Sequence, residues 1–311
     1  MEIKKVQDDF FDNAQRIEIY NSYDPYILHL LKRFYTMNNI DCIVASDFDL
    51  DVYLKEFSNV KYIYVNFQAN HIEEINKLSN LNGISLTNKQ IKRIDDKILN
   101  KIEYLEIFYI NKEQVDFNRL KSLKHLSLRN YPFEDLEIDK ELISLRINSA
   151  SKLTILKGIN SNNLIKLELN DLGKLNVIDL NCPNLKFFKI YDSKKLTNLE
   201  DFLGTCKKLR EIKINSYSDF NATLKSIDFI NNLDELEYFS TTFKILDGNL
   251  KPLLKIKNAK IYHFYRNYNL KDKELPHEEV LLDENGEVNI VKLSELSKGK
   301  EDERIVWMDK L

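Results

Sequence analysis

The chain has 311 residues, with 46 Lys and Arg against 49 Asp and Glu, giving a formal net charge of −3. This balance provides no overall charge that would favour nucleic acid, and a hydrophobic content of 43% is too high for a disordered chain. Seven glycines and five prolines exclude collagen-like sequence and linkers rich in these residues.

The first residues predict a cytoplasmic protein. The opening decapeptide contains no apolar core of the kind found in secretory signals, and no apolar run in the chain is long enough to cross a membrane. The three cysteines, Cys42, Cys182 and Cys206, are too few and odd in number for a disulfide framework. We therefore expect a reducing compartment and no membrane association.

Residues 1–39 are expected to form an N-terminal cap. Ile17 and Ile19 indicate a first strand, and Asp24-Pro25 then resembles the N-cap and first turn of a helix. The helix would bury the apolar positions that follow at helical spacing, which are Ile27, Leu30, Leu31 and Phe34.

A hexamer with the pattern L-x-x-L-x-L recurs through residues 40–263, with Ile, Val or Phe often replacing Leu. Eleven copies follow one another at intervals of 19 to 27 residues, most of them 20 to 22. Such a period is typical of a stacked repeat, in which each hexamer forms a short strand of a parallel sheet. The apolar positions would point into the core, and the positions between them would form the opposite face of the sheet. Their first residues are 40, 60, 81, 102, 123, 142, 164, 185, 209, 236 and 256.

This pattern resembles the leucine-rich repeat family, and the short bacterial repeats of internalin-like proteins most closely. The resemblance implies an α/β solenoid, a horseshoe of about 11 repeats of ~21 residues with a parallel concave β-sheet. It implies a helical or irregular convex side, and residues 49–57, 71–78, 195–203 and 251–256 look helical. The family's usual Asn or Cys after each strand is replaced here, for example by Gln68, Lys89 and Ile110. We therefore expect a less regular curvature.

Residues 264–311 are expected to form a C-terminal cap. Residues 280–291 read as a β-hairpin around Asn285-Gly286, a pair typical of a type I′ turn. This segment carries 8 basic and 12 acidic residues, a net charge of −4, and Trp307 would anchor it. It would cover the open end of the sheet.

The predicted concave face is the main candidate for function, because tyrosine and arginine are enriched at binding hot spots. One rung of this face, made of Gly83, Ser85 and Thr87, has only small side chains. Either it leaves a slot about 10 Å wide for a partner side chain, or the neighbouring tyrosines cover it. We expect a non-enzymatic module that binds an unknown partner protein as an adaptor, an antitoxin-like inhibitor or an effector. The expected contact residues are Tyr62, Tyr64, Tyr104, Phe108, His125, Arg129, Arg146, Phe187, Lys189, Tyr191, Lys213 and Tyr238.

Two other functions remain open. Asp49 and Asp51 resemble the nucleophile loop of haloacid-dehalogenase-type phosphatases, which would imply a Mg²⁺-dependent enzyme. However, Val52-Tyr53 replaces the usual Gly-Thr, and no Gly-Asp pair occurs in the chain. A local basic patch of Arg146, Lys189, Lys213 and Lys260 could instead bind an anionic polymer, although the balanced total charge makes nucleic acid an unfavoured partner.

The sequence predicts no cofactor and no metal. The acidic residues at 47, 49 and 51 begin like a calcium-binding loop, but that loop would need Gly at position 52 and Glu at position 58, which are Val and Ser. Cys182 and Cys206 occupy equivalent positions in successive repeats, which predicts buried neighbouring thiols. Stacking within bonding reach would also permit a redox switch.

Overall fold

A computed structural model describes a large part of the chain, in two compact units, residues 1–132 and 133–311. The predicted cap helix at 24–34, Asp49, Asp51 and all of 264–311 lie outside the described residues. The described residues are 16–19, 42–45, 54, 58–65, 67–158, 161–193, 195–216, 222–247, 249, 252 and 260–263.

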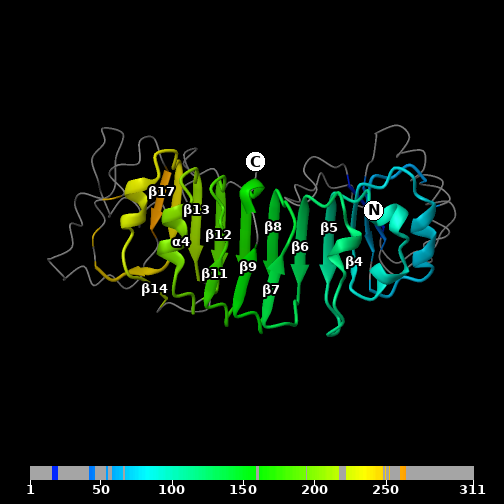
Figure 1. Cartoon of the computed structure of the whole chain (residues 1–311), viewed down its shortest axis with the longest axis horizontal. Coiled ribbons are helices and arrows are strands. Elements are labelled where there is room, and N and C mark those ends of the chain that lie inside the picture. The colour runs from blue at the N-terminus through cyan, green and yellow to red at the C-terminus, as the bar shows by residue number, and fades with distance from the viewer. Residues whose placement is uncertain are drawn as a thin grey trace. The chain divides into compact units, whose positions relative to one another are not determined.

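The first unit is built on a parallel sheet in which each strand pairs with the next one along the chain (Figure 1). The register is regular: Ser85, Glu106 and Ser127 lie opposite one another on three successive strands. Every predicted hexamer of this unit coincides with a strand. The strands are β1 (Arg16–Ile19), β2 (Cys42–Ala45), β3 (Tyr62–Val65), β4 (Gly83–Thr87), β5 (Tyr104–Phe108) and β6 (His125–Arg129).

The second unit contains a parallel sheet of the same kind, again with one strand for each predicted hexamer. The prediction of the last hexamer at 256–261 is two residues too early, because Ile261 and not Ala259 pairs with the central Phe239 of the preceding strand. Its members pair in chain order, apart from strands that belong to other sheets. They are β8 (Ser144–Asn148), β10 (Lys166–Asn170), β12 (Phe187–Tyr191), β13 (Glu211–Asn215), β15 (Tyr238–Thr241) and β17 (Lys260–His263).

Some of the segments that return between these strands are themselves strands, where helical or irregular structure was expected. In the second unit β7 (Asp135–Ile138), β9 (Ile155–Gly158) and β11 (Val177–Asp179) form a second parallel sheet. One apolar residue of each is buried, and these three lie in register: Leu136, Leu156 and Ile178. β14 (Thr223–Leu224) and β16 (Lys244–Ile245) form a further parallel pair.

The helices of the described residues are short. The return predicted as a helix at 71–78 is a 3₁₀ turn, η1 (Ile72–Lys77), and the one at 195–203 is shifted to α4 (Leu199–Thr205). The shift has a cause, because the Thr197 N–H donates to Asn176 O and Asn198 Nδ2 donates to Ile178 O, which ties both residues to the neighbouring return. The remaining helices are η2 (Gln90–Arg93), α3 (Asp96–Leu99), η3 (Phe117–Arg119), η4 (Ser161–Asn163) and η5 (Asp228–Asn232).

The predicted apolar positions form the core of each unit. The central residues of the described hexamers, such as Ile84, Leu105, Leu167 and Phe188, are fully buried. Because strand side chains alternate between the two faces, this burial places the intervening residues on the opposite face of each sheet. No helix in the described part of the chain is long and apolar enough to cross a membrane.

A left-handed residue follows four of the long strands. Asn130, Ser149, Asp171 and Asp192 come directly after β6, β8, β10 and β12, and each has a φ between 49° and 58°. Asn and Asp adopt this conformation more readily than most residues because their short polar side chains bond locally. The chain therefore makes this recurrent turn without glycine, which is consistent with its low glycine content.

Candidate functional site

We define the strand face of each sheet as the surface formed by the intervening strand positions, opposite the apolar core. All twelve residues predicted to bind a partner lie at such positions. In the first unit they are Tyr62, Tyr64, Tyr104, Phe108, His125 and Arg129. In the second unit they are Arg146, Phe187, Lys189, Tyr191, Lys213 and Tyr238.

An aromatic row runs across the first unit. Tyr62 and Tyr104 lie on either side of Gly83 in the strand register, and their rings meet edge to face with centroids 5.7 Å apart. The Tyr104 ring also stacks on His125 at 4.1 Å. The predicted slot at Gly83 is therefore wrong, because the missing side chain lets two tyrosines close over the glycine. Edge-to-face and stacked pairs stabilise such a row beyond its burial.

A buried carboxylate, Glu106, lies in the middle of the same face. Its Oε2 accepts a hydrogen bond from Ser85 Oγ at 2.8 Å, and its Oε1 accepts one from Ser127 Oγ at 3.2 Å. The Glu106 side chain is only 2% exposed, so these bonds replace its lost hydration. Glu106 and Ser127 were not among the predicted site residues, although their spacing of 21 residues already placed them in one row.

Arg129 completes this cluster and reaches solvent. Its Nε donates to Glu106 Oε1 at 2.7 Å, and its guanidinium carbon lies 4.9 Å from the centroid of the Phe108 ring. Phe108 and Arg129 face each other on β5 and β6. The Arg129 side chain is 41% exposed, in contrast to the buried Glu106 beneath it. Glu106 thus holds the guanidinium of Arg129 at its Nε, and the Phe108 ring lies against the same group.

A second carboxylate, Glu168, organises the strand face of the other unit. Arg146 Nε donates to Glu168 Oε2 at 2.5 Å from the neighbouring strand. The ammonium groups of Lys166 and Lys189 each form an ion pair with Oε1 at 3.3 Å. Three cations from β8, β10 and β12 therefore surround one carboxylate whose side chain is 6% exposed.

The electrostatics of Glu168 are set by two opposing effects. Burial raises the pKa of the Glu168 carboxyl group, but the positive charges of Arg146, Lys166 and Lys189 outweigh it and lower the pKa to about 2. The group is therefore ionised at neutral pH. Its charge holds three cationic side chains at one place on the sheet.

The Glu168 cluster continues onto β13. Lys213 Nζ lies 2.9 Å from Glu211 Oε1, and the same ammonium group lies 5.1 Å from the centroid of the Tyr238 ring. Across the ends of β8 and β10, Asn170 Nδ2 donates to Asn148 Oδ1 at 2.6 Å. The second unit thus presents a mixed polar and aromatic surface, in which Arg146, Lys189, Lys213 and Tyr238 lie as the sequence predicted.

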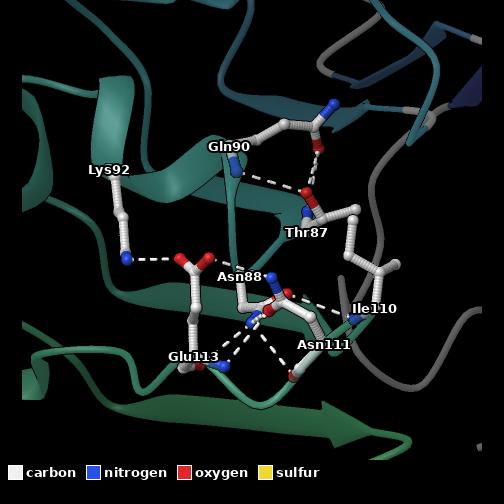
Figure 2. A network of polar contacts seen from close by, with 7 residues as sticks. All are labelled: Thr87, Asn88, Gln90, Lys92, Ile110, Asn111 and Glu113. Atoms are coloured by element: carbon white, nitrogen blue, oxygen red, sulfur yellow. Dashed lines mark hydrogen bonds and ion pairs between the residues drawn. The ribbon is translucent and has the colours of Figure 1, made fainter.

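A polar network at the end of β4 fixes the turn that follows it (Figure 2). Asn88 is fully buried, and its Nδ2 donates to Asn111 Oδ1 at 2.5 Å and to Glu113 O at 2.9 Å. Its Oδ1 accepts from the Ile110 N–H at 3.2 Å. Lys92 closes the network through an ion pair with the Glu113 carboxylate. Asn88 thus bridges two successive turns. It lies one position before Lys89, where the leucine-rich repeat pattern usually has Asn or Cys.

No group of three or more His, Cys, Asp or Glu in the described part of the chain could hold a metal ion. Cys182 and Cys206 are buried free thiols, and burial raises the pKa of Cys182 to about 12 and that of Cys206 to about 11, which suppresses their thiolate forms. Asp49 and Asp51, the candidate phosphatase pair, lie outside the described residues.

No protein-family model matches the chain, and no curated protein matches it in sequence.

Proposed function

We propose that the chain is a non-enzymatic protein-binding module whose strand faces contact a partner protein. In this proposal it is a solenoid of the leucine-rich repeat type, similar to the internalin-like proteins of bacteria, and it acts in the cytoplasm. The observation that carries the proposal is the ordered polar and aromatic surface on both sheets. Glu106 and Glu168 hold arginine and lysine side chains in fixed positions there, next to half-buried aromatic rings.

The physical reason is pre-organisation. A binding surface loses less side-chain entropy on association when its long side chains are already fixed in the free protein. Tyrosine and arginine are also the residues that contribute most at protein interfaces. The short parallel strands pair with their neighbours along their full length, and this pairing gives the side chains a rigid support.

Affinity capture from native cytosol, followed by mass spectrometry, tests this function. The wild type would be compared with His125→Ala and Lys166→Gln, which change the strand faces of the first and second units. Lys101→Ala and Lys152→Gln are matched controls, because both lysines are exposed and lie in turns outside the strands. We expect a stoichiometric partner whose recovery falls about tenfold in at least one face variant and is unchanged in both controls.

Two results would contradict the proposal. The first is a partner lost with a control variant but kept by both face variants, which would move the contact to the returns. The second is the absence of any stoichiometric partner from cytosol of the native organism. Circular dichroism of each variant would confirm that it is folded before its capture result is interpreted.

Binding of an anionic polymer is a second candidate, favoured by one observation. Arg146, Lys166, Lys189 and Lys213 gather around the carboxylates of Glu168 and Glu211 on four neighbouring strands. If a polyanion binds there, retention on heparin should fall steeply with salt and should weaken in Lys166→Gln. Retention that does not depend on Lys166 would eliminate this candidate.

A further inference from the structure

We propose that Arg129 is a pre-oriented anchor for a carboxylate, supplied by an aspartate or glutamate side chain of the protein partner. This inference rests on the proposed function, since it names the chemistry recognised on the strand face of the first unit. It depends on how Arg129 is held and on which of its nitrogens remain exposed.

The guanidinium of Arg129 is fixed by two contacts that leave its outer edge accessible. Glu106 binds Nε, and the Phe108 ring lies against the guanidinium plane. Within the described part of the chain, the terminal Nη1 and Nη2 groups contact no acceptor, and the side chain is 41% exposed. These two nitrogens form the planar fork that binds both oxygens of a carboxylate at once.

The other described arginines with exposed side chains are arranged differently. Arg210 is 42% exposed, but both its Nε and its Nη2 bind Glu237, itself an exposed residue. Arg119 uses Nε for Asp96 and Nη2 for the Ile94 carbonyl oxygen. Arg93 pairs through Nη2 with Glu73, whose side chain is 49% exposed. Among these residues, Arg129 alone combines a buried carboxylate behind it with unused terminal nitrogens in front.

Glu106 gives Arg129 its orientation without competing for the incoming group. Both Glu106 oxygens already accept hydrogen bonds from Ser85, Ser127 and Arg129, and the carboxylate is buried. The positive charge therefore faces solvent while its compensating charge lies beneath the surface. An incoming anion meets a guanidinium whose rotation is already restricted, so little further order is lost on binding.

The surroundings favour a carboxylate over a phosphate group. A dianionic phosphate is normally held by several cations or by backbone N–H groups, whereas Arg129 stands here beside the negative charge of Glu106. Lys124, at the opposite end of β6, is paired with Glu103 at 2.6 Å. The Phe108 ring also offers an apolar surface to the methylene groups of an acidic side chain.

Titration of the full-length wild type with small anions tests the site directly, without any variant. Guanidinium signals of Arg129 and Arg210 would be followed by ¹⁵N NMR during addition of N-acetylglutamate, and separately of inorganic phosphate. We expect saturable shifts at Arg129 with N-acetylglutamate and much smaller shifts at Arg210. Equal or non-saturating shifts at the two arginines would overturn the proposal. Tighter binding of phosphate than of N-acetylglutamate at Arg129 would overturn the assignment to a carboxylate.

A second test of the Arg129 proposal measures binding of the captured partner protein to variants of this chain. Arg129→Gln and Arg129→Lys would be compared with Arg210→Gln, the control of equal exposure. We expect at least about tenfold weaker partner binding for Arg129→Gln, a smaller loss for Arg129→Lys, and no change for Arg210→Gln. A partner bound equally well by Arg129→Gln would overturn the anchor and leave the binding function intact. Absence of any partner would contradict the binding function, while the NMR titration would still decide whether Arg129 binds carboxylates.

Discussion

A buried carboxylate organises part of the strand face of each unit. Glu106 binds two serines and Arg129, and Glu168 holds Arg146, Lys166 and Lys189. A buried charge is stable only when it is paired and solvated by neighbouring groups, and both residues meet that condition. Each glutamate therefore helps to fix the positions of the cations beside it.

We predict that Glu168→Gln lowers the free energy of unfolding by about 3 kcal/mol at pH 7. The folded-state pKa of about 2 lies below the ordinary value of 4.5, so the ionised carboxylate stabilises the fold above pH 4.5. This contribution is lost as the pH falls from about 4.5 through about 2. Urea unfolding of the wild type should show that loss, and the same curves for Glu168→Gln should show less of it.

Glu237→Gln is the matched control for this measurement. Glu237 also pairs with an arginine, but its side chain is 58% exposed. Exposed ion pairs contribute about 0–1 kcal/mol, so this variant should unfold almost like the wild type. An equal effect of the two substitutions would contradict the assigned role of Glu168.

We predict that Asn88→Ala destabilises the first unit by about 3 kcal/mol. The substitution removes one acceptor and two donor interactions of a fully buried amide and leaves Ile110 N–H and Glu113 O without their partner. Lys89→Ala, at the exposed neighbouring position, should change stability by less than about 0.5 kcal/mol. Thermal unfolding of both variants checks the prediction, and similar midpoints for the two would refute it.

At the scale of elements, sequence periodicity predicted the strands well and the returns poorly. Most of the described strands present two apolar residues to the core, as Ile84 and Leu86 do, and the sequence pattern recurs eleven times. Among the described side chains, β7, β9 and β11 share one row of buried residues in register, which is too weak a pattern to separate strand from irregular structure.

The candidate site was predictable in position but not in contacts. Alternation along the strands placed residues such as Tyr104 and Arg129 on one face. Which of them touch depends on rotamers, so the sequence left open whether tyrosines cover the rung at Gly83, and the structure shows Tyr62 and Tyr104 meeting there. The Ser85, Glu106 and Ser127 row was detectable, since its members lie 21 residues apart. The unused terminal nitrogens of Arg129 had no counterpart in the sequence.

The left-handed residues after the strands give a prediction of their own. Ser149 is exposed and has a φ of 55°, a conformation that a β-branched residue adopts with strain. We expect Ser149→Val to cost about 1–2 kcal/mol of unfolding free energy, and Ser149→Gly to be nearly neutral. Chemical denaturation measures both. The same change at Ser151, which is exposed without a positive φ, serves as the control and should have little effect.

At the scale of the whole molecule, each unit is held together by contacts between successive strands. β10 pairs only with β8 and β12 in its sheet, so a strand's stability depends mainly on its two neighbours. This organisation differs from a globular core, in which residues distant in sequence meet at one centre.

We therefore predict a graded response to damage in one strand. Leu169→Ala removes a fully buried side chain of β10 and should cost about 2–5 kcal/mol. Native-state hydrogen exchange should show the largest loss of amide protection in β8, β10 and β12, and a smaller loss in β15. Equal loss throughout the second unit would show instead that its strands unfold as one cooperative block.

The row that contains Glu168 limits how the number of repeats can change. Arg146, Glu168 and Lys189 face one another on β8, β10 and β12, with the negative charge between the two positive ones. Loss of the segment from β10 to the start of β12 would keep the apolar register but bring Arg146 directly opposite Lys189. Like charges at opposing strand positions destabilise a sheet. The core would tolerate the gain or loss of a repeat at this point. The order of charges on the strand face would nevertheless make such a change unfavourable.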